Sequence, residues 1–356
     1  MAFSLIETIS FRNLEDKKVN IDSSSIFIVG ENGQGKTNFL DAVYTLCYGS
    51  SFRQGNDSSS ARLGDRAWCV KGNNKEGYKC VVSWKDGSKS ITENEKTVYD
   101  RKTLVERNPA IVFCHEDMEF ARGEPERRRF FFDQTASLVS ASYIDLLRLY
   151  RRALKARNMA FKEKSMDILD VLDLQIAIYG IGLCEERSKM AAVFDQVFAP
   201  RFEEVARLGT RISLEYRPSW KNLDSAEEIA KSLGASREKE LILGTSLSGP
   251  HRDRFVFTDD SGDFSGRAST GQLRLLSLTL RIAQAEYYSA STGRYPTLLL
   301  DDVLLELDPD KKQRFMSLLP KHEQAFFTFL PGEPFANYKS PDTLVYWADN
   351  GRFLPA

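Results

Sequence analysis

The chain has 356 residues, enough for two domains or for one domain that carries a large insertion. It contains 49 Lys and Arg against 50 Asp and Glu, and 42% of its residues are hydrophobic. This balance excludes a disordered polyelectrolyte and an evenly basic protein, but it permits a local basic patch. Five widely spaced cysteines, and no apolar run near the ~20 residues of a membrane span, predict a cytoplasmic protein without a membrane partner.

The first part of the chain alternates between strand and helix patterns. Residues 25–29 form a short apolar run that is followed by glycine, which predicts a buried strand. Residues 38–48 then show apolar side chains at helical spacing, after a glycine-rich turn. Residues 66–100 alternate between apolar and polar side chains around turn residues, which predicts antiparallel hairpins. We expect residues 1–134 to form the first half of an α/β domain.

The middle of the chain has a different pattern. Apolar residues recur every three or four positions in residues 135–240, which predicts an inserted helical lobe with two long helices. Residues 241–356 return to α/β character, with strand-like apolar runs at 297–300 and 325–330. The expected fold class is therefore α/β, with one domain that is split in the sequence by a helical arm.

The segment from Gly30 to Thr37 fits the pattern GxxxxGK[ST] in full, between a predicted strand and a predicted helix. Glycines let backbone N–H groups approach phosphate oxygens, and the following helix adds the positive end of its dipole. Lys36 would reach the β- and γ-phosphates, and the Thr37 hydroxyl would ligate Mg²⁺. The alternative is a chance glycine turn that caps a helix. The residues expected to bind nucleotide here are Gly30, Glu31, Asn32, Gly33, Gln34, Gly35, Lys36, Thr37 and Asn38.

A second acidic segment completes such a site. The apolar run 298–300 ends in Asp301 and Asp302. A buried strand that ends in a carboxylate can hold Mg²⁺ opposite the threonine of the phosphate loop, so Asp301 is expected to bind the metal, through water. Asp302 would then orient or polarise the attacking water. Such strand ends are also ordinary turn or cap positions, and the two segments together are the stronger signal.

Lys36 and Asp301 lie far apart in the sequence, although one nucleotide site needs both. Compact P-loop enzymes connect these two strands with much less chain, so the nucleotide-binding fold must be split around residues 135–240. This layout resembles ABC-type ATPase heads, including the SMC and Rad50 families, in which a long coiled coil fills the insertion. At ~1.5 Å per helical residue, the insertion here allows only a short arm.

Ser269, Thr270, Gly271 and Gln272 open a predicted helix shortly before the acidic strand. This segment resembles the ABC signature motif, whose serine and helix N-terminus contact the γ-phosphate that is bound to the other subunit. Taken alone, it is also an ordinary helix N-cap, because serine caps helices readily. Asp308 follows the acidic strand where an ABC D-loop would lie.

The chain as a whole resembles the RecF family of bacterial recombination mediators. The resemblance extends nearly from end to end and rests on GENGQGKTN at 30–38, GPHRD at 249–253, STGQ at 269–272 and LLLDDVLLELD at 298–308. It implies a weak, DNA-stimulated ATPase that acts in DNA replication, recombinational gap repair and the SOS response. Thr270 departs from the family pattern, which usually has glutamine at that position.

The same resemblance implies a mechanism and partners. ATP and Mg²⁺ would drive head-to-head dimerisation on duplex or gapped DNA, and slow hydrolysis would release it. Each composite site would join the residues around Lys36 and Asp301 of one subunit to residues of the other, namely Ser269, Gly271, Gln272 and Asp308. Arg12 would contact phosphates, by similarity to Rad50-type heads. RecR would bind directly and RecO through it, in the cytoplasm and associated with the nucleoid.

Residues 148–164 give independent support for DNA binding. They include seven basic side chains, Arg157 among them, and a helix would place Arg148, Arg152 and Lys155 on one face. A solvated helix face explains the same pattern about as well. Two other functions remain open: an ABC-type ATPase subunit of a transport or defence system, and a nucleotide-binding scaffold without turnover.

Overall fold

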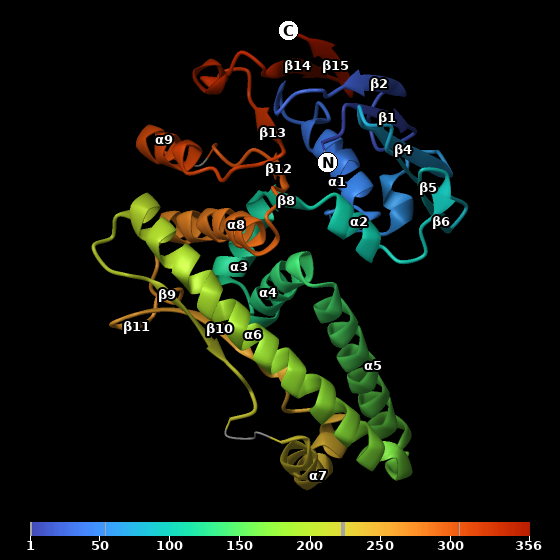
Figure 1. Cartoon of the computed structure of the whole chain (residues 1–356), viewed down its shortest axis with the longest axis vertical. Coiled ribbons are helices and arrows are strands. Elements are labelled where there is room, and N and C mark those ends of the chain that lie inside the picture. Colours follow the sequence, from blue (N-terminus) through green and yellow to red (C-terminus); the bar gives the residue numbers. More distant parts are fainter. Residues whose placement is uncertain (1, 54, 222–224, 306) are drawn as a thin grey trace. The chain divides into compact units, whose positions relative to one another are not determined.

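A computed structural model describes residues 2–53, 55–221, 225–305 and 307–356 (Figure 1). The chain forms two compact units. Unit 1 joins Met1–Glu116 to Tyr288–Ala356, and unit 2 consists of Asp117–Tyr287. The boundaries between these units differ from the boundaries of the three segments expected from the sequence. The division into three segments stays a prediction. Glu306, inside the acidic motif at 298–308, lies outside the described residues.

One of the two six-stranded sheets of unit 1 is mostly parallel. Its strand order is β15-β14-β3-β13-β12-β8, and only β15 runs antiparallel to its neighbour. The central strands are buried along nearly their whole length, as expected when both faces of a parallel sheet are covered. The strands predicted at 25–29 and 297–300 are confirmed. The strand bounds are β3 Ser25–Val29, β8 Ala110–Phe113, β12 Thr297–Leu300, β13 Gln324–Phe329, β14 Leu344–Asp349 and β15 Arg352–Pro355.

A second, antiparallel sheet of unit 1 has the order β2-β1-β4-β5-β6-β7. Helix α1 (Lys36–Tyr48) contributes Phe39 and Leu46 to one core cluster with Val82 of this sheet and Phe326 of the mostly parallel one. The antiparallel hairpins predicted in residues 66–100 are confirmed. The remaining elements of unit 1 are β1 Leu5–Ile9, β2 Lys17–Asn20, β4 Ala67–Asn73, β5 Lys79–Lys85, β6 Ser88–Glu93, β7 Lys96–Thr97, α2 Lys102–Arg107 and α9 Pro309–Ser317.

Unit 2 is mainly helical and contains the two long helices that the apolar spacing predicts. Its helices are α3 Met118–Arg122, α4 Pro125–Val139, α5 Ala141–Glu163, α6 Leu169–Ala206, α7 Ala226–Leu243 and most of α8 Thr270–Thr292. A three-stranded sheet accompanies them, made of β9 Ser213–Arg217, β10 Arg254–Asp259 and β11 Gly262–Asp263. Strand β9 was not predicted, because its five residues pair with β10, which lies far along the chain.

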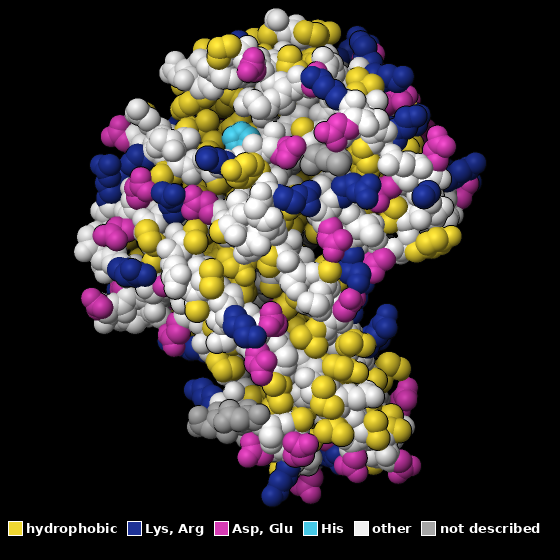
Figure 2. Space-filling view, viewed as in Figure 1, with side chains coloured by type: hydrophobic (Ala, Val, Ile, Leu, Met, Phe, Trp, Pro, Cys, Tyr) yellow, Lys and Arg dark blue, Asp and Glu magenta, His cyan; other side chains and the backbone are white. Residues whose placement is uncertain are grey.

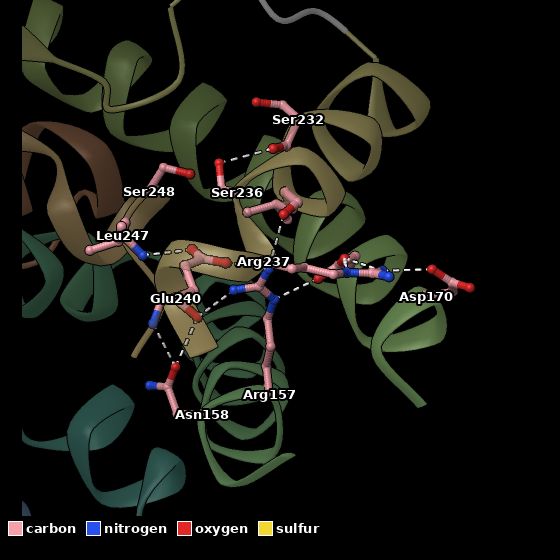
Figure 3. A network of polar contacts seen from close by, with 12 residues as sticks. Arg157, Asn158, Asp170, Ser232, Ser236, Arg237, Glu240, Leu247 and Ser248 are labelled. Atoms are coloured by element: carbon pink, nitrogen blue, oxygen red, sulfur yellow. Dashed lines mark hydrogen bonds and ion pairs between the residues drawn. The ribbon is translucent and has the colours of Figure 1, made fainter. Parts of the chain in front are cut away.

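A buried network of ion pairs connects α5, α6 and α7 (Figure 3). Arg157 of α5 has no exposed surface, and its guanidinium lies 2.5 Å from Asp173 and 2.7 Å from Glu240. It also donates to the Ser246 hydroxyl at 2.8 Å. A charge removed from water is tolerated only when it is paired in this way. Arg157 therefore does not belong to the basic surface that residues 148–164 suggested.

No described helix is both long enough and apolar enough to span a bilayer.

Candidate nucleotide site

The phosphate loop connects the end of β3 to the start of α1, both in unit 1. Gly33 and Gly35 have φ angles of +80° and +100°, which side chains with a Cβ rarely adopt. Gly35 occupies the N-cap position of α1 without any side-chain cap, so the first N–H groups of the helix keep their capacity to bind an anion. The loop predicted from the sequence therefore has the backbone geometry of an anion site.

Lys36 is buried at the first position of α1, with 4% of its surface exposed. Its Nζ donates to the carbonyl oxygens of Gly30 at 2.8 Å and Glu31 at 3.2 Å. The same ammonium lies 4.0 Å from a carboxylate oxygen of Asp302. The side chain therefore lies back over the loop, with its charge at the place where phosphate oxygens would enter.

The structure brings Thr37 and Asp301 into direct contact, although they belong to distant parts of the chain. The Thr37 hydroxyl donates to Oδ1 of Asp301 at 2.9 Å. This follows from the sheet order, because β3, β13 and β12 are neighbours and parallel strands end at the same edge. A hydroxyl and a carboxylate side by side are oxygen donors of the type that Mg²⁺ takes.

The electrostatics of Asp301 also favour a cation. The pKa of this carboxyl is raised to about 6, mainly by burial and to a smaller extent by the charge of the neighbouring Asp302. Hydrogen bonds from Thr37 and Thr328 lower the pKa and only partly compensate. Ionised Asp301 is thus held in an unfavourable state that a divalent cation would relieve.

Thr328, the fifth residue of β13, connects the two aspartates. Its Oγ1 accepts the backbone N–H of Asp302 at 2.7 Å and lies 2.8 Å from Asp302 Oδ1 and 3.3 Å from Asp301 Oδ1. A hydroxyl carries one proton, so it donates to one carboxylate at a time. Asp302 has a φ of +49°, an uncommon conformation that the Thr328 hydroxyl supports by accepting its N–H.

Arg12 contacts a residue that the sequence analysis missed. Its Nε donates to the carboxylate of Asp41 at 2.7 Å, and its Nη2 donates to the Ser51 hydroxyl at 3.0 Å. Asp41 lies on α1 and is fully buried. The sequence pattern that could have identified it is a charged residue on an otherwise apolar face of the predicted helix. The guanidinium of Arg12 is engaged by these two partners, so a contact between Arg12 and phosphate stays a prediction.

Asn38 belongs to a second polar chain beside the loop. Its side-chain amide donates to Asn13 Oδ1 at 2.7 Å and accepts from Arg53 at 2.8 Å. Asn13 in turn donates to the carbonyl of Gly33 at 3.2 Å. Asn13 was not identified from the sequence, because nothing in its local pattern shows that it reaches a loop twenty residues away.

The signature-like residues lie in unit 2, at the start of α8. The Ser269 hydroxyl accepts the N–H of Gln272 at 3.3 Å, and the Gln272 side chain accepts the N–H of Ser269 at 2.8 Å. This reciprocal capping box leaves Ser269 and Gly271 exposed. The N-cap interpretation therefore describes the local structure, and a contact with nucleotide stays a prediction.

Asp308 caps α9 in unit 1. Its carboxylate accepts the N–H of Lys311 at 2.9 Å and pairs with the Lys311 ammonium at 2.6 Å. The hydrogen bond from the Lys311 side chain lowers the pKa of this carboxyl, so Asp308 is ionised at neutral pH. The side chain is exposed, and its role toward a second subunit stays a prediction.

The predicted DNA-contacting residues lie on the solvent side of α5. Arg152 and Lys155 are exposed, while Arg148 forms a 3.6 Å ion pair with Asp145 one turn earlier. Hydrophobic side chains also gather over α5 and α6 (Figure 2). The exposed apolar residues of these two helices are Leu149, Met159, Val171, Leu174, Ile178 and Val193.

His251, in the GPHRD segment, lies in unit 2 and acts as a hydrogen-bond centre. Its Nδ1 is 2.7 Å from the Tyr150 hydroxyl, and its Nε2 is 3.1 Å from the Ser246 carbonyl. Burial lowers the pKa of His251 to about 4, so the ring is neutral at physiological pH. The described contacts favour a structural role over a catalytic one.

Comparisons with known proteins agree with this geometry. The family model for the RecF/RecN/SMC N terminal domain matches residues 3–338. A Treponema pallidum protein named DNA replication and repair protein RecF is 42% identical, covering 96% of this chain and 98% of that protein. A protein of the same name from Staphylococcus carnosus is 30% identical, covering 92% of this chain and 93% of that protein.

Solved structures extend the comparison to the fold. The recombination mediator protein RecF, solved as RecF-ATPrS in the RecFOR pathway, matches with a TM-score of 0.87 and 25% identity. The match covers 99% of this chain and 98% of that one. An Smc head bound to the winged-helix domain of ScpA matches with a TM-score of 0.56 and 14% identity, and shares the fold alone. The chain belongs to the RecF family of DNA replication and repair proteins, and it has the α/β fold of ABC-type SMC heads.

Proposed function

We propose that this protein binds ATP and Mg²⁺, closes on DNA as a head-to-head dimer, and opens again after slow hydrolysis. The observation that carries the proposal is the contact between Thr37 and Asp301, 2.9 Å apart and contributed by the two distant halves of unit 1. Membership of a family of DNA replication and repair proteins supports the DNA part. The relative solved as RecF-ATPrS supports the nucleotide part.

The loop and its helix would bind the triphosphate. The N–H of Gly30 donates to the Phe329 carbonyl, so the N–H groups from Glu31 to Asn38 would supply the donors. Lys36 would exchange its loop carbonyls for β- and γ-phosphate oxygens. Mg²⁺ would bind the Thr37 hydroxyl directly and Asp301 through water. When bound, Mg²⁺ neutralises the charge that develops on the phosphates.

Hydrolysis would depend on Asp302. Its carboxylate lies between Lys36 and the Thr328 hydroxyl, at 4.0 Å and 2.8 Å respectively. A carboxylate in that position can orient a water molecule toward the γ-phosphate. The ATPase activity expected of the family is weak. Slow turnover is sufficient here, because ATP binding closes the dimer and hydrolysis serves only to release it.

A second copy would complete each site. Ser269 and Gly271 lie exposed and Gln272 half-buried at the N-terminus of a 23-residue helix, where the helix dipole favours an anion. Asp308 is also exposed. Because these groups have accessible surfaces, the γ-phosphate of a partner subunit could meet them in a sandwich dimer.

DNA would contact the solvent face of α5. Arg148, Arg152 and Lys155 can neutralise phosphates there, which would make binding strongly dependent on salt. RecR, and RecO through RecR, are the expected protein partners. A relative placed in the RecFOR pathway supports them. The protein would act in the cytoplasm, associated with the nucleoid.

A gel-shift assay on gapped duplex DNA tests the proposal. Binding should require ATP, should be lost in Lys36→Ala, and should persist longer in Asp302→Asn, which binds ATP but cannot turn it over. Asp65→Asn is the control, since its carboxylate is exposed. DNA binding that is absent, or equal with and without ATP, would contradict the proposal and favour another ABC-type ATPase.

A further inference from the structure

The turn between β14 and β15 lies against the phosphate loop. It consists of Asn350 and Gly351, whose φ angles of +47° and +80° make a tight two-residue hairpin turn. Strand β14 pairs in parallel with β3, the strand that leads into the loop. The C-terminal hairpin therefore lies beside the N-terminal elements of unit 1 (Figure 1).

Two consecutive hydrogen bonds join this turn to Gln34. The N–H of Asn350 donates to the Gln34 side-chain oxygen at 2.6 Å, and the N–H of Gly351 donates to the Gln34 backbone oxygen at 3.0 Å. The Gln34 side chain is therefore engaged with the hairpin. Only its backbone N–H stays suited to the nucleotide role that the sequence predicted for it.

Close packing accompanies these bonds. A Cβ at Gly30 would lie 2.6 Å from the carbonyl oxygen of Ala348 on β14. A Cβ at Gly35 would lie 3.3 Å from the Cα of Gly351. The first glycine of the loop and its last glycine both pack closely against the hairpin, so the loop is constrained at both of its ends.

Gly351 also contacts the segment on its other side. A Cβ there would lie 1.9 Å from the carbonyl oxygen of Asn13, closer than any side chain could be accommodated without movement. The Asn13 side chain donates to Gly33 of the loop at 3.2 Å. Any side chain at position 351 would therefore displace a second support of the loop as well.

We propose that the Asn350–Gly351 turn is a positioning element for nucleotide binding, acting through Gln34 and Asn13 on the phosphate loop. This inference rests on the proposed function. A glycine-rich loop has many conformations when it is free, and fixing it on binding is unfavourable. The hairpin fixes the loop in advance, so less of the binding free energy is lost in ordering it.

The test compares two glycines in equivalent turns. Gly87 follows Asp86 in the β5–β6 turn with φ angles of +46° and +87°, and a Cβ at Gly87 would meet nothing within 4 Å. Gly87→Ala and Gly351→Ala therefore impose similar backbone strain, and only the second disturbs the loop. Gln34→Met is a third variant, which keeps the length of the side chain and removes the hydrogen-bond acceptor.

We expect Gly351→Ala to weaken ATP binding about tenfold or more relative to Gly87→Ala, since two hydrogen bonds and two close contacts are disturbed. Gln34→Met should raise the ATP Kd several-fold and the KM in parallel, with kcat changed less, because Asp301 and Asp302 do not touch the turn. Direct titration with ATP and a thermal melt of each variant measure affinity and stability separately.

The outcomes are distinguishable. If Gly351→Ala does not fold, Gln34→Met decides alone. If the wild-type protein binds ATP and both Gly351→Ala and Gln34→Met bind it as well as Gly87→Ala does, the positioning role is wrong while the proposed function stands. If the wild-type protein binds no ATP, the proposed function fails and this inference fails with it.

Discussion

Replacing Asp301 by Asn should stabilise the protein when neither nucleotide nor Mg²⁺ is present. The folded chain raises the pKa of this carboxyl from 3.8 to about 6, mainly by burying it. The folded state therefore holds the proton more tightly than the unfolded state, and stability falls as the pH rises from 3.8 through about 6. At 1.36 kcal/mol per pKa unit, ionising Asp301 costs the folded state about 3 kcal/mol at neutral pH.

Urea unfolding of wild type and Asp301→Asn at pH 7.5 and pH 4 measures this cost. The variant should be more stable by up to about 3 kcal/mol at the higher pH, because it carries no buried charge, and the difference should shrink toward zero at the lower pH. Asp65→Asn is the matched control, since its side chain is exposed. ATP with Mg²⁺ should reverse the order, because only the wild type gains the bound metal.

Two results would refute this reasoning. Asp301→Asn could be no more stable than the wild type at pH 7.5, which would mean that Asp301 is not penalised by burial. Alternatively, its advantage could be the same at both pH values, which would assign it to packing and not to charge.

Three further predictions concern other parts of the structure. Arg157→Met should destabilise the protein by about 3–5 kcal/mol in urea unfolding, because Asp173 and Glu240 would then be buried without their partner; an equal effect of Arg152→Met, on the exposed face, would argue against this. The lowered pKa of His251 means that its contribution to stability is complete above pH 6.5 and is lost as the pH falls toward about 4. His251→Gln should flatten that part of the pH profile, and an unchanged profile would count against a buried neutral ring. Thr328→Val keeps the shape of the side chain but removes its bonds to both aspartates, so kcat for ATP should fall about 10- to 100-fold, with little change in Kd measured by titration.

Local patterns in the sequence were sufficient for the parts of the site that are contiguous. The glycine spacing predicts the phosphate loop because glycine adopts a positive φ most readily, as Gly33 and Gly35 do with φ angles of +80° and +100°. The apolar run before Asp301 predicts a buried strand for the same local reason. Their contact could be anticipated because parallel strands end at one edge of a sheet.

What the sequence could not supply were contacts between distant segments that have no pattern of their own. The Asn350–Gly351 pair predicts a hairpin turn, but it does not show which segment the turn contacts, so the hydrogen bond from the Asn350 N–H to Gln34 could not be predicted. Arg157 looked like part of a basic surface, because a charge run does not show which members find buried partners. Strand β9 was missed since its pairing lies with β10.

The central claim is that each nucleotide site is built from two copies of the chain, and mixing two inactive variants tests it most directly. Lys36→Ala lacks the phosphate-loop side, and Ser269→Arg blocks the partner side. In a mixture, half of the dimers are mixed and each has one intact composite site, so ATPase activity should return to roughly a quarter of the wild-type value. Lys36→Ala mixed with Asp302→Asn is the control, because both changes damage the same side and no dimer gains an intact site. Activity no greater than the sum of the separate variants in the first mixture would contradict the account.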